Sequence, residues 1–383
     1  MNEQGIIARK AFFLFLLTTI FLIFILAGCK NERNPAPQPS SKDESSLIKE
    51  KSTRVQPPTF KPIQIDDGAF NTISGWLDND TILYITDSSS GSNVHSHNLY
   101  NGENKLLFES SFPIVSVLIS PLREYFLVHS SPSTNEALIT VYTKDGQQVL
   151  EKKIPSTEVN IEWNLYNESS ILITAFTEDW EFTVWNLNCE EATLLEVSLP
   201  QPFGYWLKEN ELLYLDWDLE TPSLYASLKK YNLLTSESSD VLSQVLQVDT
   251  FKDIFMTIEV EEENNQNAAY TFFSNDNEEL LSFETPHLSN YSDWLIPYYD
   301  YNLGMEKFIT YQPLYYGEAD TYADGFHLIA YDIKTGESSV LLEGLENEPL
   351  SCSPDGEKCL SGFYLEKLIH LESKEIVSIA NIE

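Results

Sequence analysis

The segment Trp76-Leu77-Asp78-Asn79-Asp80-Thr81-Ile82-Leu83-Tyr84 is followed, 130 residues later, by the similar segment Trp206-Leu207-Lys208-Glu209-Asn210-Glu211-Leu212-Leu213-Tyr214. Both begin with Trp-Leu and end with Leu-Tyr. An offset of this size is about three times 43, and related segments recur at that interval along the chain. They fall near residues 77, 121, 164, 207, 251, 295 and 354, so only the last gap is irregular. The chain therefore contains a repeat of about 43 residues.

Each repeat unit contains four short runs of strand-forming residues. In the first unit these runs cover residues 71–76, 81–86, 94–100 and 105–109. Turn-forming pairs such as Asn101-Gly102 punctuate the chain between such runs. Four strands in a unit of this length are typical of a β-propeller blade, and no segment after residue 60 shows the sustained apolar period of a helix. The predicted fold class is all-β, a propeller of four-stranded blades, with seven blades by repeat count and six as the alternative.

The chain is predicted to have three parts, with boundaries at changes in composition. Residues 1–28 form a leader, and residues 29–59 are rich in Pro, Ser, Asn, Gln and Lys without a periodic apolar pattern. Such a composition is typical of a flexible tether. Residues 60–383 form the propeller domain. Its first segment, 60–66, can add a strand to the last blade, so that both ends of the chain close the ring.

The leader has the layout of a secretory signal. Arg9 and Lys10 precede a mostly apolar run from residue 11 to 27, and Leu26-Ala27-Gly28-Cys29 follows. That tetrapeptide resembles the lipobox of bacterial lipoproteins, in which the cysteine is acylated and becomes the new N-terminus. The resemblance implies lipidation of Cys29 and attachment to the outer side of the cytoplasmic membrane. An uncleaved membrane helix is the alternative.

The repeats also resemble those of known propellers. Cys352-Ser353-Pro354-Asp355-Gly356 is similar to repeats of the TolB and WD40 kind, although the Trp-Asp dipeptide of the WD40 third strand is absent. The lipobox, the tether and the Trp-Leu-x-x-Asn/Asp segments together resemble the YqgU-like propeller lipoproteins of Gram-positive spore formers. That family is described as six-bladed, so the resemblance implies six blades where the spacing predicts seven.

The charge of the chain excludes one class of partner. It has 59 acidic and 23 basic residues, a net charge of −36, and 42% hydrophobic residues, which is ample for a large core. Binding to nucleic acid needs clustered Lys and Arg, so no nucleic-acid partner is expected. Anionic lipid headgroups would also repel the chain, so the acyl group on Cys29 must supply the membrane attachment. Plausible partners are cations, basic protein surfaces and neutral sugars.

Few residues point to catalysis or to a metal. Cys352 and Cys359 flank a hairpin turn and can form a disulfide in an oxidising exterior, with free thiols as the alternative. Cys189 is expected in the core. His95 and His97 would project from one face of a strand, but no third ligand lies near them, so no metal site and no cofactor are expected. The sequence contains no hydrolase elbow, phosphate loop or His-Glu-x-x-His helix.

The candidate binding residues lie in loops. In a propeller, the connections between second and third strands emerge on the same face as those between blades, and function tends to reside in loops held by a rigid scaffold. In the third to sixth units these connections are acidic and aromatic, and the sixth, 312–325, is the longest. The predicted binding residues are Asp179, Trp180, Asp216, Trp217, Asp218, Glu220, Glu261, Glu262, Tyr315, Tyr316, Glu318, Asp320, Tyr322 and Asp324.

These observations predict a lipid-anchored extracytoplasmic propeller that binds or scaffolds an envelope protein or a glycan through loops on one face. The alternative is a glycan-active envelope enzyme that uses paired carboxylates as acid and base. Nothing in the sequence requires an enzyme. The repeated tryptophans, Trp76, Trp163, Trp206 and Trp294, are expected to pack between blades rather than to hold a ligand.

Overall fold

The computed structural model describes residues 59–218, 221, 223–260, 266–289 and 294–382. All of them belong to the second of the two units into which the chain divides, Gln56–Glu383. The leader, Cys29 and the tether up to residue 58 lie outside the described residues. Within the described part of the chain, no helix is long and apolar enough to span a membrane.

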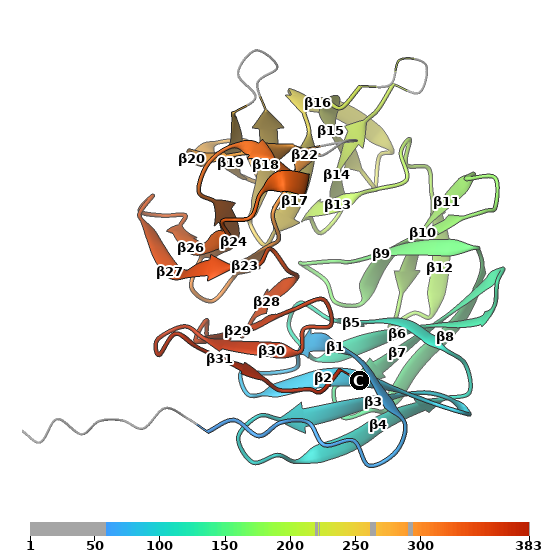
Figure 1. The fold of residues 1–383 in the computed structure, drawn as a ribbon. Coiled ribbons are helices and arrows are strands. Elements are labelled where there is room, and N and C mark those ends of the chain that lie inside the picture. Colours follow the sequence, from blue (N-terminus) through green and yellow to red (C-terminus); the bar gives the residue numbers. More distant parts are fainter. Residues whose placement is uncertain (1–58, 219–220, 222, 261–265, 290–293, 383) are drawn as a thin grey trace, which may run out of the picture. The chain divides into compact units, whose positions relative to one another are not determined.

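Seven antiparallel sheets of four strands each form a ring (Figure 1). In each of these sheets the strands follow one another in chain order, and the first strands of most neighbouring sheets contact each other around the centre of the ring. Blades 1 to 4 consist of β1 (Ala69–Trp76), β2 (Thr81–Ser88), β3 (Gly91–Asn98), β4 (Asn104–Ser110), β5 (Ile114–Ile119), β6 (Tyr125–Ser133), β7 (Glu136–Thr143), β8 (Gln148–Pro155), β9 (Glu158–Trp163), β10 (Ser170–Phe176), β11 (Phe182–Asn188), β12 (Thr193–Val197), β13 (Tyr205–Lys208), β14 (Glu211–Asp216), β15 (Ala226–Asn232) and β16 (Glu237–Val245). Blades 5 to 7 consist of β17 (Gln247–Phe251), β18 (Ile254–Val260), β19 (Asn267–Ser274), β20 (Glu279–Pro286), β23 (Tyr299–Asn302), β24 (Lys307–Pro313), β26 (Phe326–Asp332), β27 (Ser338–Leu345), β28 (Leu350–Cys352), β29 (Lys358–Ser361), β30 (Lys367–His370) and β31 (Glu375–Ser378).

The repeat spacing gave the correct number of blades, but it misplaced the sixth. Trp294-Leu295 forms β22 (Trp294–Leu295), which pairs with β21 (Leu288–Ser289) in a separate small sheet. The first strand of blade 6 is β23, which begins four residues after β22 ends. The cause is an inserted segment between blades 5 and 6, which contains β21 and β22. The extra residues that disturb the repeat spacing are therefore divided between this segment, before β23, and the long loop that follows β24.

The core lies between neighbouring blades. One apolar cluster joins Met256 and Phe272 of blade 5 to Phe308 of blade 6, and others join blade 6 to blade 7 and blade 7 to blade 1. The second strands supply much of it, and all seven residues of β10 are buried. Burial of apolar side chains in this way is the main driving force for assembling the ring.

The tryptophans of the first strands contribute to the same contacts. The Nε1–H group of Trp206 in blade 4 donates to the main-chain oxygen of Glu162 in blade 3 at 3.1 Å. That of Trp76 in blade 1 donates to Ser351 in blade 7 at 2.9 Å. Trp163 instead bonds within its own blade, to the oxygen of Glu168. The predicted packing between blades is confirmed for Trp76, Trp163 and Trp206, since each lies in an apolar cluster that joins two neighbouring blades. The side chain of Trp294 lies outside the described residues.

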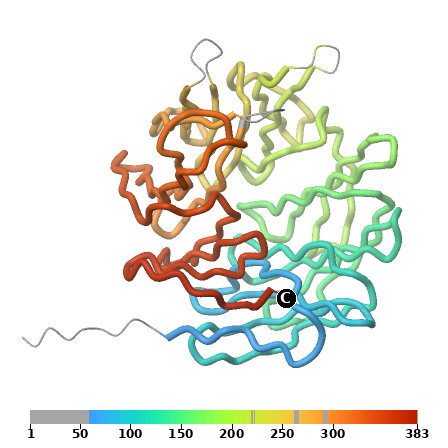
Figure 2. Tube along the Cα trace, in the orientation of Figure 1, coloured from blue at the N-terminus to red at the C-terminus, as the bar shows by residue number. Residues whose placement is uncertain are grey.

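The ring closes without a strand exchanged between the two ends of the chain. Blade 7 takes all four of its strands from the C-terminal sequence. The prediction that 60–66 adds a strand is wrong, because this segment runs beside the end of the chain with one backbone bond to it, from Ile63 N–H to the oxygen of Ile379 at 2.7 Å (Figure 2). Ile63 and Ile379 pack in one apolar cluster with residues of blades 1 and 7. The buried ammonium group of Lys358 adds an ion pair across the closure, to Asp80 at 3.3 Å.

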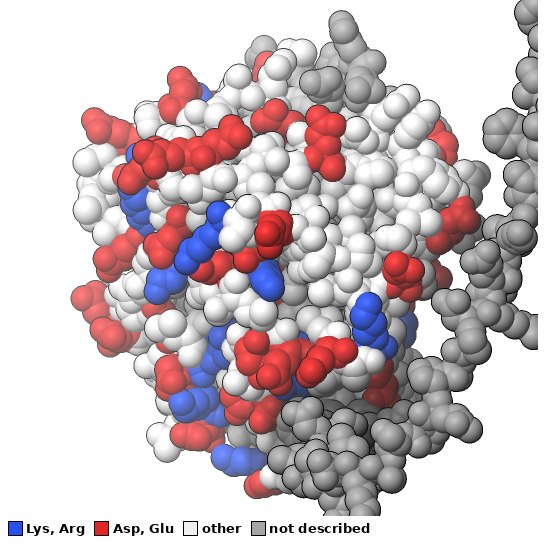
Figure 3. Space-filling view, turned by 90° about the vertical axis from the view of Figure 1, so that its left-hand side faces the viewer, with Lys and Arg blue, Asp and Glu red and all other residues white. Residues whose placement is uncertain are grey.

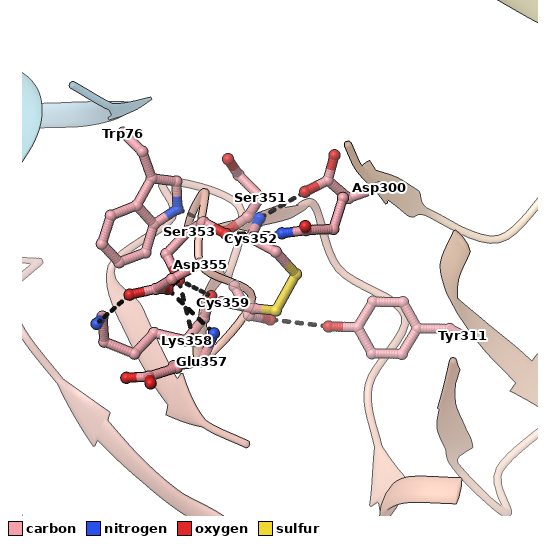
Figure 4. The surroundings of a disulfide bond; sticks show 12 residues. Trp76, Asp300, Tyr311, Ser351, Cys352, Ser353, Asp355, Glu357, Lys358 and Cys359 are labelled. Atoms are coloured by element: carbon pink, nitrogen blue, oxygen red, sulfur yellow. Dashed lines mark hydrogen bonds and ion pairs between the residues drawn. A yellow bond between two sulfur atoms is a disulfide. The ribbon is translucent and has the colours of Figure 1, made fainter. Parts of the chain in front are cut away.

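A disulfide joins two facing strands of blade 7. Cys352 of β28 and Cys359 of β29 are directly opposite each other and are bonded (Figure 4). Both sulfur-bearing residues are buried, and Cys189 is buried with a free thiol. The hairpin between the two cysteines is further fixed by Ser353, whose hydroxyl donates to Asp355 at 2.5 Å and accepts from the Lys358 N–H at 3.1 Å.

Candidate functional site

The two faces of the ring carry different connections. Because the strands of each blade alternate in direction, the β2–β3 and β4–β5 connections and their counterparts emerge on one face, which we call the loop face. The β1–β2 and β3–β4 connections and their counterparts emerge on the opposite face, which we call the turn face. All the binding residues predicted from the sequence that the structure describes belong to the loop face.

An aromatic cluster marks the loop face between blades 3 and 4. Around the buried ring of Phe176 lie Trp180, Phe182 and Phe203, with ring centroids 6.1, 6.5 and 5.9 Å from it. Trp180 is 70% exposed and Phe203 is 47% exposed. A tight turn, closed by a bond from Thr177 N–H to the oxygen of Glu181 at 2.9 Å, holds Trp180 at its tip. The cluster therefore presents preorganised apolar surface to solvent.

The predicted residues of blade 4 are less available to a binding partner, because they are bonded within the fold or half-buried. The carboxylate of Asp216 is paired with Lys229 at 2.8 Å, and the main-chain oxygen of Trp217 accepts a bond from Gln201 at 3.1 Å. Trp217 is half-buried, whereas Asp218 is exposed. Three predicted residues lie outside the described part of the chain: Glu220, Glu261 and Glu262.

The long loop of blade 6 is an ordered element. Its β25 (Gly317–Glu318) pairs in parallel with β21, and the 3-10 turn Ala319–Thr321 follows. Tyr322 holds the loop against the blade, since its hydroxyl donates to the Gly325 main-chain oxygen at 2.6 Å and its ring packs on Phe326 of β26. Five of the predicted residues of this loop are exposed: Tyr315, Tyr316, Glu318, Asp320 and Asp324. The hydroxyl of Tyr315 donates a hydrogen bond to the carboxylate of Asp324.

The exposed aromatic side chains of the whole described propeller share one face. Nine Phe, Tyr and Trp side chains are exposed among the described residues, and all nine lie in or beside loop-face connections. They are Phe112, Trp180, Phe182, Phe203, Tyr298, Tyr315, Tyr316, Phe363 and Tyr364. Sequence reasoning missed six of them, because it examined only long second-to-third connections. The inter-blade connections, which emerge on the same face, contained the signal for Phe112, Phe203 and Tyr298.

Acidic side chains accompany these aromatic residues. Asp179, Asp218, Glu318, Asp320 and Asp324 are all exposed on the loop face. The excess of acid is general, and Asp and Glu outnumber Lys and Arg on the side of the molecule shown in Figure 3. The predicted residues do not form one continuous strip. The cluster of blades 3 and 4 and the loop of blade 6 are on the same face, and no hydrogen bond, ion pair or ring contact joins them within the described residues.

The turn face has a cavity of about 570 Å³ at the centre of the ring. The ends of the first strands of six blades line it. Its charged groups are Arg123, Lys252 and Asp300. The Asp300 carboxylate accepts a bond from the Cys352 N–H at 2.6 Å (Figure 4). Burial raises the pKa of this carboxyl group, while backbone N–H donors and the positive charge of Arg123 favour its charged form.

A second group of titratable side chains lies on the inner strands of blades 3 to 6. Burial and the neighbouring charge of Asp249 raise the pKa of Glu162 to about 7. Burial also raises the pKa of Asp249, whose carboxylate accepts bonds from Thr250 N–H at 2.7 Å and from the Tyr299 hydroxyl at 3.0 Å. Two carboxyl groups that interact in this way are a possible acid–base pair. The histidines singled out in the sequence are elsewhere, and both ring nitrogens of His97 are bonded, to Asn104 and Lys61.

Comparison with known proteins agrees with this architecture. Residues 98–362 match the model of the YqgU-like 6-bladed β-propeller domain family. The uncharacterized lipoprotein YqgU of Bacillus subtilis (strain 168) is 24% identical over 356 residues, which cover 92% of this chain and 93% of that protein. The crystal structure of the uncharacterized protein lmo1340 from Listeria monocytogenes EGD-e has a TM-score of 0.78 at 21% identity, covering 84% of this chain and 98% of that one. The β-propeller domain of the Trilobed protease from Pyrococcus furiosus, described as having an open velcro topology, has a TM-score of 0.55 at 12% identity, covering 82% and 98%.

Proposed function

This chain belongs to the YqgU-like β-propeller family, and we propose that it is a lipid-anchored extracytoplasmic module that binds a protein partner on its loop face. The family description counts six blades, whereas the described residues of this chain form seven four-stranded sheets. The observation that carries the proposal is the gathering of all nine exposed aromatic side chains of the described residues on one face.

Exposed aromatic residues on a rigid support are the usual centres of protein interfaces. Tyr, Trp and Phe supply large contact area at low entropic cost, and single residues of this kind often dominate binding. Trp180 and Phe203 have the strongest claim, because Phe176 and the Thr177 turn fix them in place before a partner arrives. The exposed acids around them favour a partner whose apolar pockets are surrounded by Lys and Arg.

The proposed location rests on the sequence and on the relative. Leu26-Ala27-Gly28-Cys29 matches a lipobox, and the Bacillus subtilis protein is named a lipoprotein. Lipidation of Cys29 followed by the tether would place the propeller outside the cytoplasmic membrane. A Cys29→Ser variant would then lose metabolic labelling by a palmitate analogue and leave the membrane fraction.

Crosslinking on intact cells, followed by mass spectrometry, tests the proposed surface. The full chain should capture a defined envelope protein, and Trp180→Ala with Phe203→Ala should lose it. Leu234→Ala is the matched control, because Leu234 is 76% exposed in a turn-face connection of blade 4. Capture that survives the aromatic double variant, or is lost equally in the control, would refute the loop face as the binding surface.

Substitutions are preferable to deleting residues 315–324. Ala319 and Tyr322 pack against the apolar cluster that joins blades 6 and 7, and β25 pairs with β21. A deletion would therefore disturb the fold as well as the surface. Tyr316→Ala changes only an exposed side chain, whereas Tyr315→Ala also removes the bond to Asp324 and the ring contact with Tyr322.

A glycan-active enzyme remains the second candidate, and the interaction between Glu162 and Asp249 is the observation that favours it. A carboxyl group with a raised pKa is suited to be the general acid of glycoside hydrolysis. Against this, Asp249 already accepts two hydrogen bonds within the fold. Glu162→Gln would abolish hydrolysis of cell-wall glycans by such an enzyme and would leave the crosslinked partner unchanged.

A further inference from the structure

The cavity on the turn face has a charge opposite to that of the protein. Among its lining residues are two cations, Arg123 and Lys252, and one acid, Asp300, although the chain carries a net charge of −36. It lies on the face opposite to the aromatic surface, so what it binds is independent of the proposed partner.

Arg123 is held at the cavity without a direct ion pair within the described part of the chain, although the carboxylates of Asp300 and Glu168 act on it from a longer distance. Its backbone has a left-handed conformation (φ 64°), fixed by a bond from its N–H to the Ser120 oxygen at 2.9 Å. The guanidinium group makes one long hydrogen bond, to the Pro121 oxygen at 3.5 Å, and no carboxylate lies within ion-pair distance of it among the described residues. Since a guanidinium group has five N–H donors, most of them are available to a ligand.

Lys252 stands on another side of the same cavity. It is half-buried in the turn between β17 and β18, and none of the described carboxylates forms an ion pair with it. The turn is fixed from blade 3, because Asp253 N–H donates to the Tyr166 hydroxyl at 2.9 Å. Asp300 offsets at most one of these two positive charges, so the cavity keeps an excess of positive charge that favours an anionic ligand.

The rest of the wall is suited to an organic ligand. Phe251 and Tyr301 stack with their ring centroids 4.6 Å apart, and Ile119 and Leu165 add apolar surface. The hydroxyl oxygen of Ser74 in the wall is buried and has no hydrogen-bond partner among the described residues. A volume of about 570 Å³ lies in the range of small-molecule sites.

We propose that this cavity binds a small organic anion, whose carboxylate or phosphate group is held by Arg123 and Lys252 and whose apolar part contacts Phe251. Arg matches both oxyanions with paired N–H donors. The negative charge of the protein surface restricts the ligand to small anions. A polyanion would be repelled by acidic residues over the whole surface, whereas salt at physiological concentration screens a single oxyanion from acidic residues more than about 8 Å away.

Binding of benzoate and benzamide to the full chain tests the proposal. The two probes have the same shape and differ in charge, and inorganic phosphate serves as a separate arm that distinguishes phosphate from carboxylate recognition. We expect benzoate or phosphate to bind with a Kd on the order of 1 mM, at least about tenfold more tightly than benzamide, as measured by ligand-detected NMR. The unliganded melting temperature of each variant verifies its fold.

Arg123→Gln should weaken anion binding at least about tenfold, and Lys252→Gln several-fold, while Arg123→Lys should restore part of it. Lys105→Gln is the matched control, because it removes one exposed cation from β4, away from the cavity. The proposal is overturned if neither anion binds, if benzamide binds as well as benzoate, or if Arg123→Gln binds like the control.

Discussion

Glu162 should make the propeller less stable at alkaline than at acidic pH. Its side chain belongs to β9, the first strand of blade 3, and burial together with the nearby Asp249 raises its pKa from 4.5 to about 7. A raised pKa means that the folded protein holds the proton more tightly than the unfolded chain does. The stabilising effect of the proton is therefore fully present below pH 4.5 and is lost as the pH rises to about 7.

The size of the effect follows from this shift. Between pH 5 and pH 8, a group with these two pKa values lowers the free energy of unfolding by about 2–3 kcal/mol. This is an upper bound, because the Glu162 side chain is only partly buried. For a domain of about 320 residues, with an unfolding entropy near 2.1 cal/mol/K per residue, it corresponds to a change of about 3–4 °C in melting temperature.

Glu162→Gln isolates this contribution, because glutamine resembles the protonated acid and does not titrate. Calorimetric melting of both proteins at pH 5 and pH 8 should give similar values at pH 5 and a variant about 3 °C more stable at pH 8. Glu158→Gln, at an exposed position of the same strand, is the control and should change little at either pH. Equal shifts of Glu162→Gln at both pH values, or a variant that is less stable at pH 8, would show that the reasoning about this carboxyl group is wrong.

Two further predictions concern the blades. Gly91 has φ 143°, and a Cβ atom there would lie 1.9 Å from the Ser110 oxygen, so Gly91→Ala should lower the free energy of unfolding by about 2–4 kcal/mol in denaturant titrations. At Gly317 a Cβ atom would meet nothing within 4 Å, so the control Gly317→Ala should change the free energy of unfolding by less than about 0.5 kcal/mol, and similar losses in both variants would contradict the prediction. Replacing Cys352 and Cys359 together by alanine opens a short loop and should cost about 2.5 kcal/mol by the chain-entropy relation, whereas an unchanged melting temperature would show that the bond does not form in the protein.

The sequence predicted the repeating architecture because the repeat is local. Each blade pairs strands that are neighbours along the chain, so the spacing of segments such as 76–84 and 206–214 was sufficient to give seven blades. The pairing of Cys352 with Cys359 is local for the same reason, since both flank one hairpin. The spacing failed at Trp294, where an inserted segment imitates the first strand of a blade but pairs with β21.

The candidate sites needed the tertiary structure. The sequence pattern predicted Trp180 and the loop of blade 6, but Phe203, Phe363 and Tyr364 share their face only because the strands of every blade alternate in direction in the same order. The cavity that contains Arg123 and Lys252 was not visible in the sequence, because these residues are 129 positions apart and come together only when the ring closes. The sequence by itself thus determined the blades, whose contacts are short-range, whereas closure of the ring decided which side chains share a face or a cavity.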